Sequence, residues 1–313
     1  MTPLNSNEIF GNWVSVLLPI NTDDSINYLK LEEEIDILIS TGVNGIYSNG
    51  TAGELYTLTE NDFDKISVLL ANKCNSSGIP FQIGCSQMSP QISLERLKRV
   101  IVLKPSAIQV ILPDWFPPSI PEIIDFLKVM GKAADPIGLV LYNPPHAKIK
   151  LKPEDFYQIM EAGIQLVGCK VSGGDESWHA AMKKLVPDLS VFVPGHHLAT
   201  GFALGAHGSY SNMACLHPQV AQKWYETMVT DIESALEIEK RIQIFMNKCI
   251  MPYIDKQNYS NQAIDKFLAA IGDWTDIGTR LRWPYKWISE DEVIKVRRVA
   301  RNILPEFFNN SLI

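Results

Sequence analysis

Short apolar runs alternate along this chain with longer stretches in which apolar residues recur at helical spacing. Apolar runs bounded by Gly, Pro or Asn are typical of buried parallel strands, and the amphipathic stretches between them predict covering helices. The strands expected from this pattern lie at residues 13–20, 43–48, 80–84, 107–112, 137–142, 164–170, 189–193 and 205–210. They recur about every 25–30 residues, which is the spacing of strand–helix–strand units in a parallel sheet.

Helix start signals and a change of pattern near Asp231 complete the predicted architecture. Thr59 is expected to cap one helix, and Ser89, followed by a proline, to cap another. After Asp231 the strand pattern stops and helical patterns follow, at 231–249, 260–271 and 289–303. We therefore expect an α/β fold: a (β/α)8 TIM barrel over residues 1–232 that carries the active site, with a C-terminal helical appendage over 233–313.

The sixth predicted strand ends in a lysine and is followed by a glycine-rich loop. By strand alternation Leu166, Gly168 and Lys170 should share one face, with Val167 and Cys169 on the other. Lys170 would then point inward at the carboxyl end of the barrel, where barrel enzymes keep their active sites. An amine sheltered from water there can attack a ketone and form an imine. Position alone favours the plainer interpretation, an ordinary lysine that extends into solvent at a strand end.

Two further strand ends carry suitable chemistry. The second strand runs into Gly50-Thr51-Ala52-Gly53-Glu54, where glycine-flanked N–H groups could converge on a carboxylate and the Thr51 hydroxyl could relay a proton. Tyr142 ends the fifth strand beside the lysine strand, and its phenol could donate to or accept from a reacting centre. The plainer alternatives are a tight turn and a packing tyrosine.

Other motifs argue against metal and nucleotide sites. The seventh strand is followed by Gly195, His196 and His197; adjacent histidines cannot easily share one metal, and no Glu or Cys lies at ligand spacing. The first strand is not followed by a dinucleotide fingerprint, and the chain has no phosphate-binding Gly-x-x-x-x-Gly-Lys loop. We therefore expect neither a metal nor a nucleotide cofactor.

Composition limits the partners and the cellular compartment that are expected for the protein. Of its 313 residues 46% are hydrophobic and 20% charged, and the formal net charge is -7, which gives no reason to expect nucleic acid or an anionic membrane as partner. No apolar run approaches a membrane span, and the first residues lack the features of a secretory signal. The five cysteines are scattered and odd in number, which is typical of free thiols in a reducing cytoplasm. A cytoplasmic protein acting on a small molecule is expected.

Taken together, four motifs resemble one known family. Gly50-Thr51-Ala52-Gly53-Glu54, Tyr142-Asn143-Pro144-Pro145, Gly168-Cys169-Lys170 and the turn at Gly195 are similar, in order and spacing, to signatures of the dihydrodipicolinate synthase / N-acetylneuraminate lyase family. The resemblance covers nearly the whole chain. It implies a class I lyase on a (β/α)8 barrel that uses a covalent lysine imine in place of a cofactor. It also implies a homo-oligomer, a dimer or a tetramer.

The resemblance assigns roles to individual residues. Lys170 would form the imine with a 2-keto acid, commonly pyruvate, and Tyr142 would transfer protons with Thr51 hydrogen-bonded to it. The backbone of Thr51 and Ala52 would hold the carboxylate of the keto acid. The full set of substrate-binding residues expected is Gly50, Thr51, Ala52, Gly195, His196, Tyr210 and Ser211.

Several positions depart from the family pattern. Ala52 replaces a second hydroxyl residue, and Trp115 stands where synthases have a relay tyrosine that acts across a dimer interface. Ala147, with Lys148 next to it, occupies the place of an arginine that clamps the carboxylate of the second substrate. His196 and its neighbour stand where acidic or aromatic residues are commoner.

These departures shape the expected function. We expect an aldolase or lyase that cleaves or condenses a 2-keto acid and an aldehyde, with a 2-keto-3-deoxy sugar acid or an N-acetylneuraminate-like substrate. The alternatives are a dehydratase or deaminase, dihydrodipicolinate synthase activity on the same imine scaffold, and a non-catalytic homologue that binds a keto acid. The aromatic loop 115–118, costly to leave in water, supports the expectation of a homo-oligomer.

Overall fold

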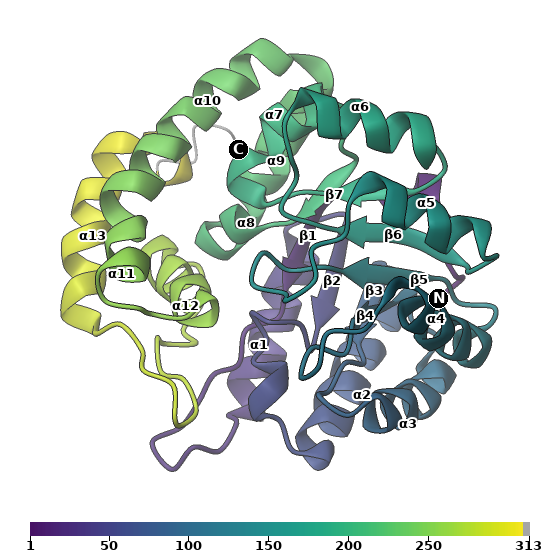
Figure 1. Ribbon diagram of the computed structural model, residues 1–313. Helices are drawn as coiled ribbons and strands as arrows, with labels where there is room; N and C mark the ends of the chain where they lie inside the picture. Colours follow the sequence, from purple (N-terminus) through teal and green to yellow (C-terminus); the bar gives the residue numbers. More distant parts are fainter. Residues whose placement is uncertain (309–313) are drawn as a thin grey trace.

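The computed structural model describes residues 1–308, which form a closed barrel of parallel strands (Figure 1). The strands are β1 (Gly11–Ser15), β2 (Gly45–Ser48), β3 (Phe81–Gly84), β4 (Ala107–Ile111), β5 (Leu139–Tyr142), β6 (Leu166–Lys170), β7 (Ser190–Phe192) and β8 (Gly208–Tyr210). Each strand pairs with the next in sequence, and β8 pairs with β1. The expected (β/α)8 barrel is confirmed.

Helices cover the barrel and continue beyond it. Around the barrel lie α1 (Tyr28–Ser40), α2 (Glu60–Ser77), α3 (Pro90–Val100), α4 (Ile120–Ala134), α5 (Pro153–Glu161), α6 (Glu176–Leu185), α7 (Leu198–Ala203), α8 (Asn212–Leu216) and α9 (Pro218–Thr230). The C-terminal region holds α10 (Ile232–Phe245), α11 (Met251–Asp255), α12 (Asn261–Gly272) and α13 (Glu290–Ile303). Figure 1 shows these last helices gathered on one side of the barrel. The helical appendage is thus present, and its predicted boundary falls at the start of α10.

Both predicted helix caps are confirmed. The Thr59 hydroxyl accepts a hydrogen bond from the Asp62 N–H at 3.1 Å, and the Asp62 carboxylate accepts one from the Thr59 N–H in return. The Ser89 hydroxyl accepts from the Ile92 N–H at 3.5 Å, and Pro90 occupies the first helical position. These side chains satisfy N–H groups that the first turn of a helix leaves unpaired.

The first and last strands are shorter than predicted. The first strand was expected at 13–20, but β1 ends at Ser15, and two residues later the Leu17 N–H donates to the Glu34 carboxylate of α1 at 2.8 Å. Residues 16–20 are buried although they lie outside the sheet, so their apolar run does not distinguish strand from buried connection. The eighth strand begins at Gly208 rather than Gly205, because Gly205 ends the turn after α7 with φ +99°.

A register shift in β6 corrects the predicted facing of its side chains. Leu139 pairs with Leu166, but Val140 pairs with Gly168, so Val167 is an extra residue on its strand. Val167 consequently packs inside the barrel, whereas Leu166 joins the outer core. Alternation resumes after the bulge, and Lys170 still reaches the interior.

The interior of the barrel is filled by side chains, so the barrel is not a channel. The inner cluster consists of Ile9, Trp13, Tyr47, Ala107, Val140, Val167, Phe192 and Tyr210. The rings of Tyr47 and Tyr210 lie 4.4 Å apart between centroids. These two rings form a floor beneath the carboxyl ends of the strands.

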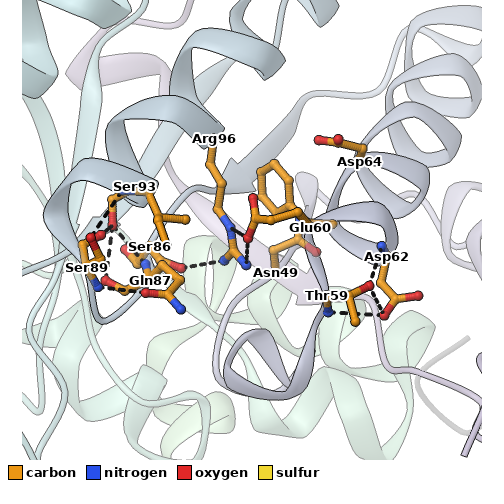
Figure 2. A network of polar contacts seen from close by, with 12 residues as sticks. Asn49, Thr59, Glu60, Asp62, Asp64, Ser86, Gln87, Ser89, Ser93 and Arg96 are labelled. Carbon is orange, nitrogen blue, oxygen red and sulfur yellow. Dashed lines mark hydrogen bonds and ion pairs between the residues drawn. The ribbon is translucent and has the colours of Figure 1, made fainter.

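A buried arginine fixes the loop after β3 (Figure 2). The Arg96 guanidinium donates to the Ser86 carbonyl at 2.8 Å and to the Glu60 carboxylate at 2.7 Å. The Ser86 hydroxyl in turn accepts from the Ile111 N–H at 2.6 Å, at the end of β4. The network therefore ties two helices to the rim of the barrel where β3 and β4 end.

A fully buried ion pair joins the C-terminal appendage to the barrel. The Lys266 ammonium of α12 lies 2.8 Å from the Glu54 carboxylate, and both side chains are 0% exposed. Glu54 follows β2 and adopts a left-handed conformation with φ +53°. Removing one partner would leave an uncompensated buried charge, which costs on the order of 3–5 kcal/mol. The pair holds the first turns of α12 over the mouth of the barrel.

Candidate active site

A cavity of about 230 Å³ opens where the strands end at their carboxyl side. Lys170 and Tyr142 are register partners at the ends of β6 and β5, and both line this cavity. The Lys170 ammonium lies 4.5 Å from the centroid of the Tyr142 ring. An ammonium at this distance is attracted to the ring face, which holds the amine beside the phenol. Lys170 is half-buried, and the cavity is lined by its side chain.

The loop after β2 contributes Thr51 and Ala52 to the cavity wall. Gly50 is not among the residues that line the cavity, and a Cβ atom there would come within 2.8 Å of the Tyr47 ring. Glycine is therefore needed for the close approach of this loop to the floor. The hydrogen bond between Thr51 and Tyr142 that the family pattern implies stays a prediction.

The loops after β7 and β8 approach each other closely at Gly195. A Cβ atom on Gly195 would lie 2.5 Å from the Ser211 hydroxyl, so only glycine allows this contact. The Asn212 side chain accepts from the His196 N–H at 3.0 Å and donates to the His196 Nδ1 at 2.9 Å. The Nδ1 atom of His196 is thus engaged by the Asn212 amide, which fixes the orientation of the ring. All four residues line the cavity.

Burial determines the charge of His196. Its pKa is lowered to about 4, first because burial disfavours the imidazolium and then because His197 and Lys170 add positive charge nearby. His196 is therefore a neutral hydrogen-bonding group at neutral pH and cannot act as a cationic clamp. His197 is exposed and does not line the cavity, so of the two adjacent imidazoles only that of His196 can contact a molecule bound there.

Tyr210 lies in the floor of the cavity. Its hydroxyl donates to the Gln82 side chain, and burial raises its pKa above the usual range. The Ser211 hydroxyl accepts from the Ala214 N–H at 3.1 Å and caps α8. The Tyr210 side chain lines the cavity but its hydroxyl proton is used within the protein, whereas the Ser211 hydroxyl proton is still available as a donor.

The structure shows where the residues that depart from the family pattern lie. Trp115 and Phe116 are 77% and 84% exposed, so the loop does not fold back onto its own barrel. The Lys148 ammonium donates to the Trp115 carbonyl at 2.8 Å. Ala147, which precedes Lys148 in the chain, lines a second cavity of about 490 Å³.

This second cavity shares Thr51 and Asn261 with the first, so the two adjoin. The larger one lacks Lys170, and we therefore regard it as an extension of the site rather than its chemical centre. Among the described residues that line the two cavities, Lys170 is the only lysine or arginine. A negatively charged second substrate would find no arginine here.

Sequence reasoning missed the contribution of the appendage to the site. The wall residues that it did not anticipate include Tyr47, Gln109, Cys215, Met246, Met251, Ile254, Asn261, Ile264 and Asp265. Most of these lie after residue 212, on helices whose placement depends on contacts such as Lys266 with Glu54. The available signal was Asp265 itself, a carboxylate directly after the apolar positions Ala263 and Ile264.

Over residues 1–308, no three His, Cys, Asp or Glu side chains are grouped in a way that could hold a metal ion. None of the described helices is both long enough and apolar enough to cross a bilayer.

Comparison with known proteins places the chain in a family. The profile of the Dihydrodipicolinate synthetase family matches residues 9–303. A 4-hydroxy-tetrahydrodipicolinate synthase from Coxiella burnetii is 24% identical over 233 residues, which cover 74% of this chain and 78% of that protein.

Solved structures agree in fold. A prophage protein of the dihydrodipicolinic acid synthase family from E. coli, in complex with pyruvate, has a TM-score of 0.83 at 18% identity, covering 94% of this chain and 98% of that one. A Ruminococcus gnavus sialic acid aldolase has a TM-score of 0.82 at 16% identity, covering 98% and 100%. With the family profile matching almost the entire length, this chain belongs to the dihydrodipicolinate synthetase family of aldolase- and lyase-type enzymes.

Proposed function

We propose that this protein is a class I aldolase or lyase that binds a 2-keto acid as an imine on Lys170. The observation that supports this most strongly is the placement of Lys170 beside Tyr142, at neighbouring strand ends in one cavity, with 4.5 Å between ammonium and ring centroid. An amine nucleophile and a phenol at this separation can both reach one small substrate. The reaction uses the lysine alone and requires no metal or other cofactor.

The proposed chemistry begins with addition of the Lys170 amine to the ketone carbon. Loss of water gives a protonated imine, which acts as an electron sink. Cleavage of the bond between the third and fourth substrate carbons sends its electron pair to the imine, forming an enamine and releasing an aldehyde. Tyr142 passes the proton of the substrate hydroxyl to the enamine carbon, and water then frees pyruvate and Lys170. The N–H groups of Thr51 and Ala52 hold the carboxylate.

We further propose a 2-keto-3-deoxy sugar acid or an N-acetylneuraminate-like compound as substrate. The two adjoining cavities provide room for a chain longer than pyruvate, and their walls offer neutral hydrogen-bonding groups such as His196 and Ser211. Ala147 supplies no clamp for a second carboxylate, and the Lys148 ammonium is turned to the Trp115 carbonyl. Since bidentate arginine is the side chain suited to a carboxylate, aspartate semialdehyde fits this site poorly.

A substrate panel tests this proposal. We expect pyruvate release from at least one 2-keto-3-deoxy sugar acid or N-acetylneuraminate, measured with a coupled lactate dehydrogenase assay. Condensation of pyruvate with aspartate semialdehyde should be slower by about 10²-fold or more, since each missing charge contact or acid–base group is worth on the order of 2–5 kcal/mol. Efficient condensation of the semialdehyde, or no release from any panel member, would contradict the proposal.

We also propose that the protein forms a homo-oligomer in which the loop 115–118 contacts a second copy. The exposed rings of Trp115 and Phe116 support this, because such a patch is costly to leave in water. Light scattering at micromolar concentration should give at least the mass of a dimer. Replacing both rings with serine should weaken association by about tenfold or more. A wild-type protein with the mass of one chain would refute this expectation.

A cytoplasmic location is proposed as well. All five cysteines are free and buried in the described structure, so none is used for a disulfide. Unpaired thiols are kept most readily in a reducing compartment.

A further inference from the structure

One acidic side chain of the C-terminal appendage lies in the wall of the imine cavity. Asp265 projects from the first half of α12 and lines the same cavity as Lys170. Among the described residues it is the only carboxylate in that wall. The neighbouring Lys266 faces away from the cavity to the Glu54 ion pair, which anchors this turn of the helix. Asp265 therefore lies on an anchored turn of α12, in the wall of the cavity that contains Lys170.

The Asp265 carboxyl has no partner within the protein. No hydrogen bond from residues 1–308 influences its ionisation, and the one charge that acts on it is that of Lys170. Burial raises its pKa to about 7, because the surrounding protein atoms replace water, while Lys170 opposes this rise. The Asp265 side chain is partly exposed within the cavity, so its carboxyl is free to contact a bound molecule.

The side chains of Tyr47, Cys215, Tyr56 and His196 near Asp265 do not change their charge near neutral pH, whereas Asp265 does. Tyr47 of β2 and Cys215 of α8 stay protonated, because burial raises the pKa of each. The charge of Asp265 adds to the rise in both cases, at Tyr47 after that of Cys215. The Tyr56 pKa is raised first by burial and then by the nearby charge of Glu54. His196, with a pKa of about 4, is neutral in this range.

We propose that Asp265 is a specificity-determining residue, which accepts a hydrogen bond from a hydroxyl group on the part of the substrate beyond the imine carbon. Its negative charge disfavours keto acids whose far end is a second carboxylate. The described walls of both cavities contain no arginine to offset that repulsion. Asp265 thus acts as an acceptor in the same cavity wall as the neutral polar side chains of His196 and Ser211, and together they suit a polyhydroxylated chain. This inference deepens the proposed function by naming what recognises the substrate.

Binding of two keto acids tests the role of Asp265. The probes are 2-keto-3-deoxygluconate, with a hydroxylated tail, and 2-ketoglutarate, with a carboxylate tail, titrated calorimetrically into the wild type and Asp265→Asn. The wild type should prefer the hydroxylated probe by at least about tenfold above pH 7, since hydrogen bonds to a charged group are the strong ones. In Asp265→Asn, which keeps the shape and loses the charge, this ratio should fall by about fivefold or more.

The pH dependence provides a second readout. The carboxylate form is populated above the raised pKa of about 7, so the preference should grow as pH rises through neutrality and fade below it. Asp265→Asn should show no such growth. Asp273→Asn, the same change at the exposed end of α12, serves as the matched control and should behave as the wild type.

The outcomes separate this inference from the proposed function. Titrations repeated in a Lys170→Ala background measure the tail contacts without imine formation, so the ratio can be read even if no imine forms. Thermal unfolding of Asp265→Asn checks its fold, and we expect no loss of stability because the replaced carboxyl is unpaired. An unchanged ratio in a folded Asp265→Asn, or no binding of either probe to the wild type, would overturn the role of Asp265.

Discussion

Replacing Lys170 with alanine is expected to lower kcat for keto acid cleavage by at least about 10⁴-fold, because the covalent step disappears. Within residues 1–308, Lys170 is the only lysine in the cavity wall, so no neighbouring amine can substitute for it. The change should leave the fold intact, because Lys170 is only half-buried and forms no ion pair in the described structure. Steady-state rates on the best substrate of the panel provide the measurement.

Lys184→Ala serves as the matched control for this loss. Lys184 is exposed on α6, the helix that follows the Lys170 strand, and lies outside the cavity. Its replacement should keep kcat within about twofold, since isolated surface changes usually have small effects. Comparable activity in Lys170→Ala and Lys184→Ala would remove Lys170 from the mechanism.

Replacing Tyr142 with phenylalanine should lower kcat by about 10²–10⁴-fold with a much smaller change in KM, because general acid–base groups contribute in this range. The ring of Tyr142 is buried and would keep its packing and its contact with the Lys170 ammonium. Imine formation with pyruvate should therefore persist while cleavage is slow. Rates and circular dichroism, measured on the same preparation, distinguish a chemical defect from a folding defect.

Tyr225→Phe provides the corresponding control. Tyr225 is a buried tyrosine of α9 that packs against Phe202 and lies outside the cavity. Removing its hydroxyl should leave turnover near that of the wild type. If Tyr142→Phe also turned over at a near-normal rate, the Tyr142 phenol would have only a structural role.

The barrel could be predicted from the sequence because each strand–helix unit has its own local pattern. Strand ends are marked by Gly, Pro and Asn, and the ends of parallel strands necessarily meet at one rim. That reasoning is sufficient to bring Lys170 and Tyr142 together. It fails at Val167, where a bulge changes the face of one residue, and at residues 16–20, which are buried without belonging to the sheet.

The part of the site formed by the appendage could not be predicted in this way. The position of Asp265 depends on how α12 docks, and docking is determined by contacts between residues far apart in the chain. One is the pair of Lys266 with Glu54, separated by more than 200 positions. Another is the close approach of Gly272 to the Leu216 carbonyl, where a Cβ atom would have no room. Periodicity identifies α12 as a helix but contains no information about which face meets the barrel.

The central claim is that Lys170 forms an imine with a 2-keto acid, and reductive trapping tests it most directly. The wild type, Lys170→Ala and Lys184→Ala are each incubated with pyruvate and borohydride, and intact masses are compared. We predict one reduced pyruvate adduct on the wild type and on Lys184→Ala, and none on Lys170→Ala. An adduct of equal yield on Lys170→Ala, or the absence of any adduct on the wild type, would contradict the claim.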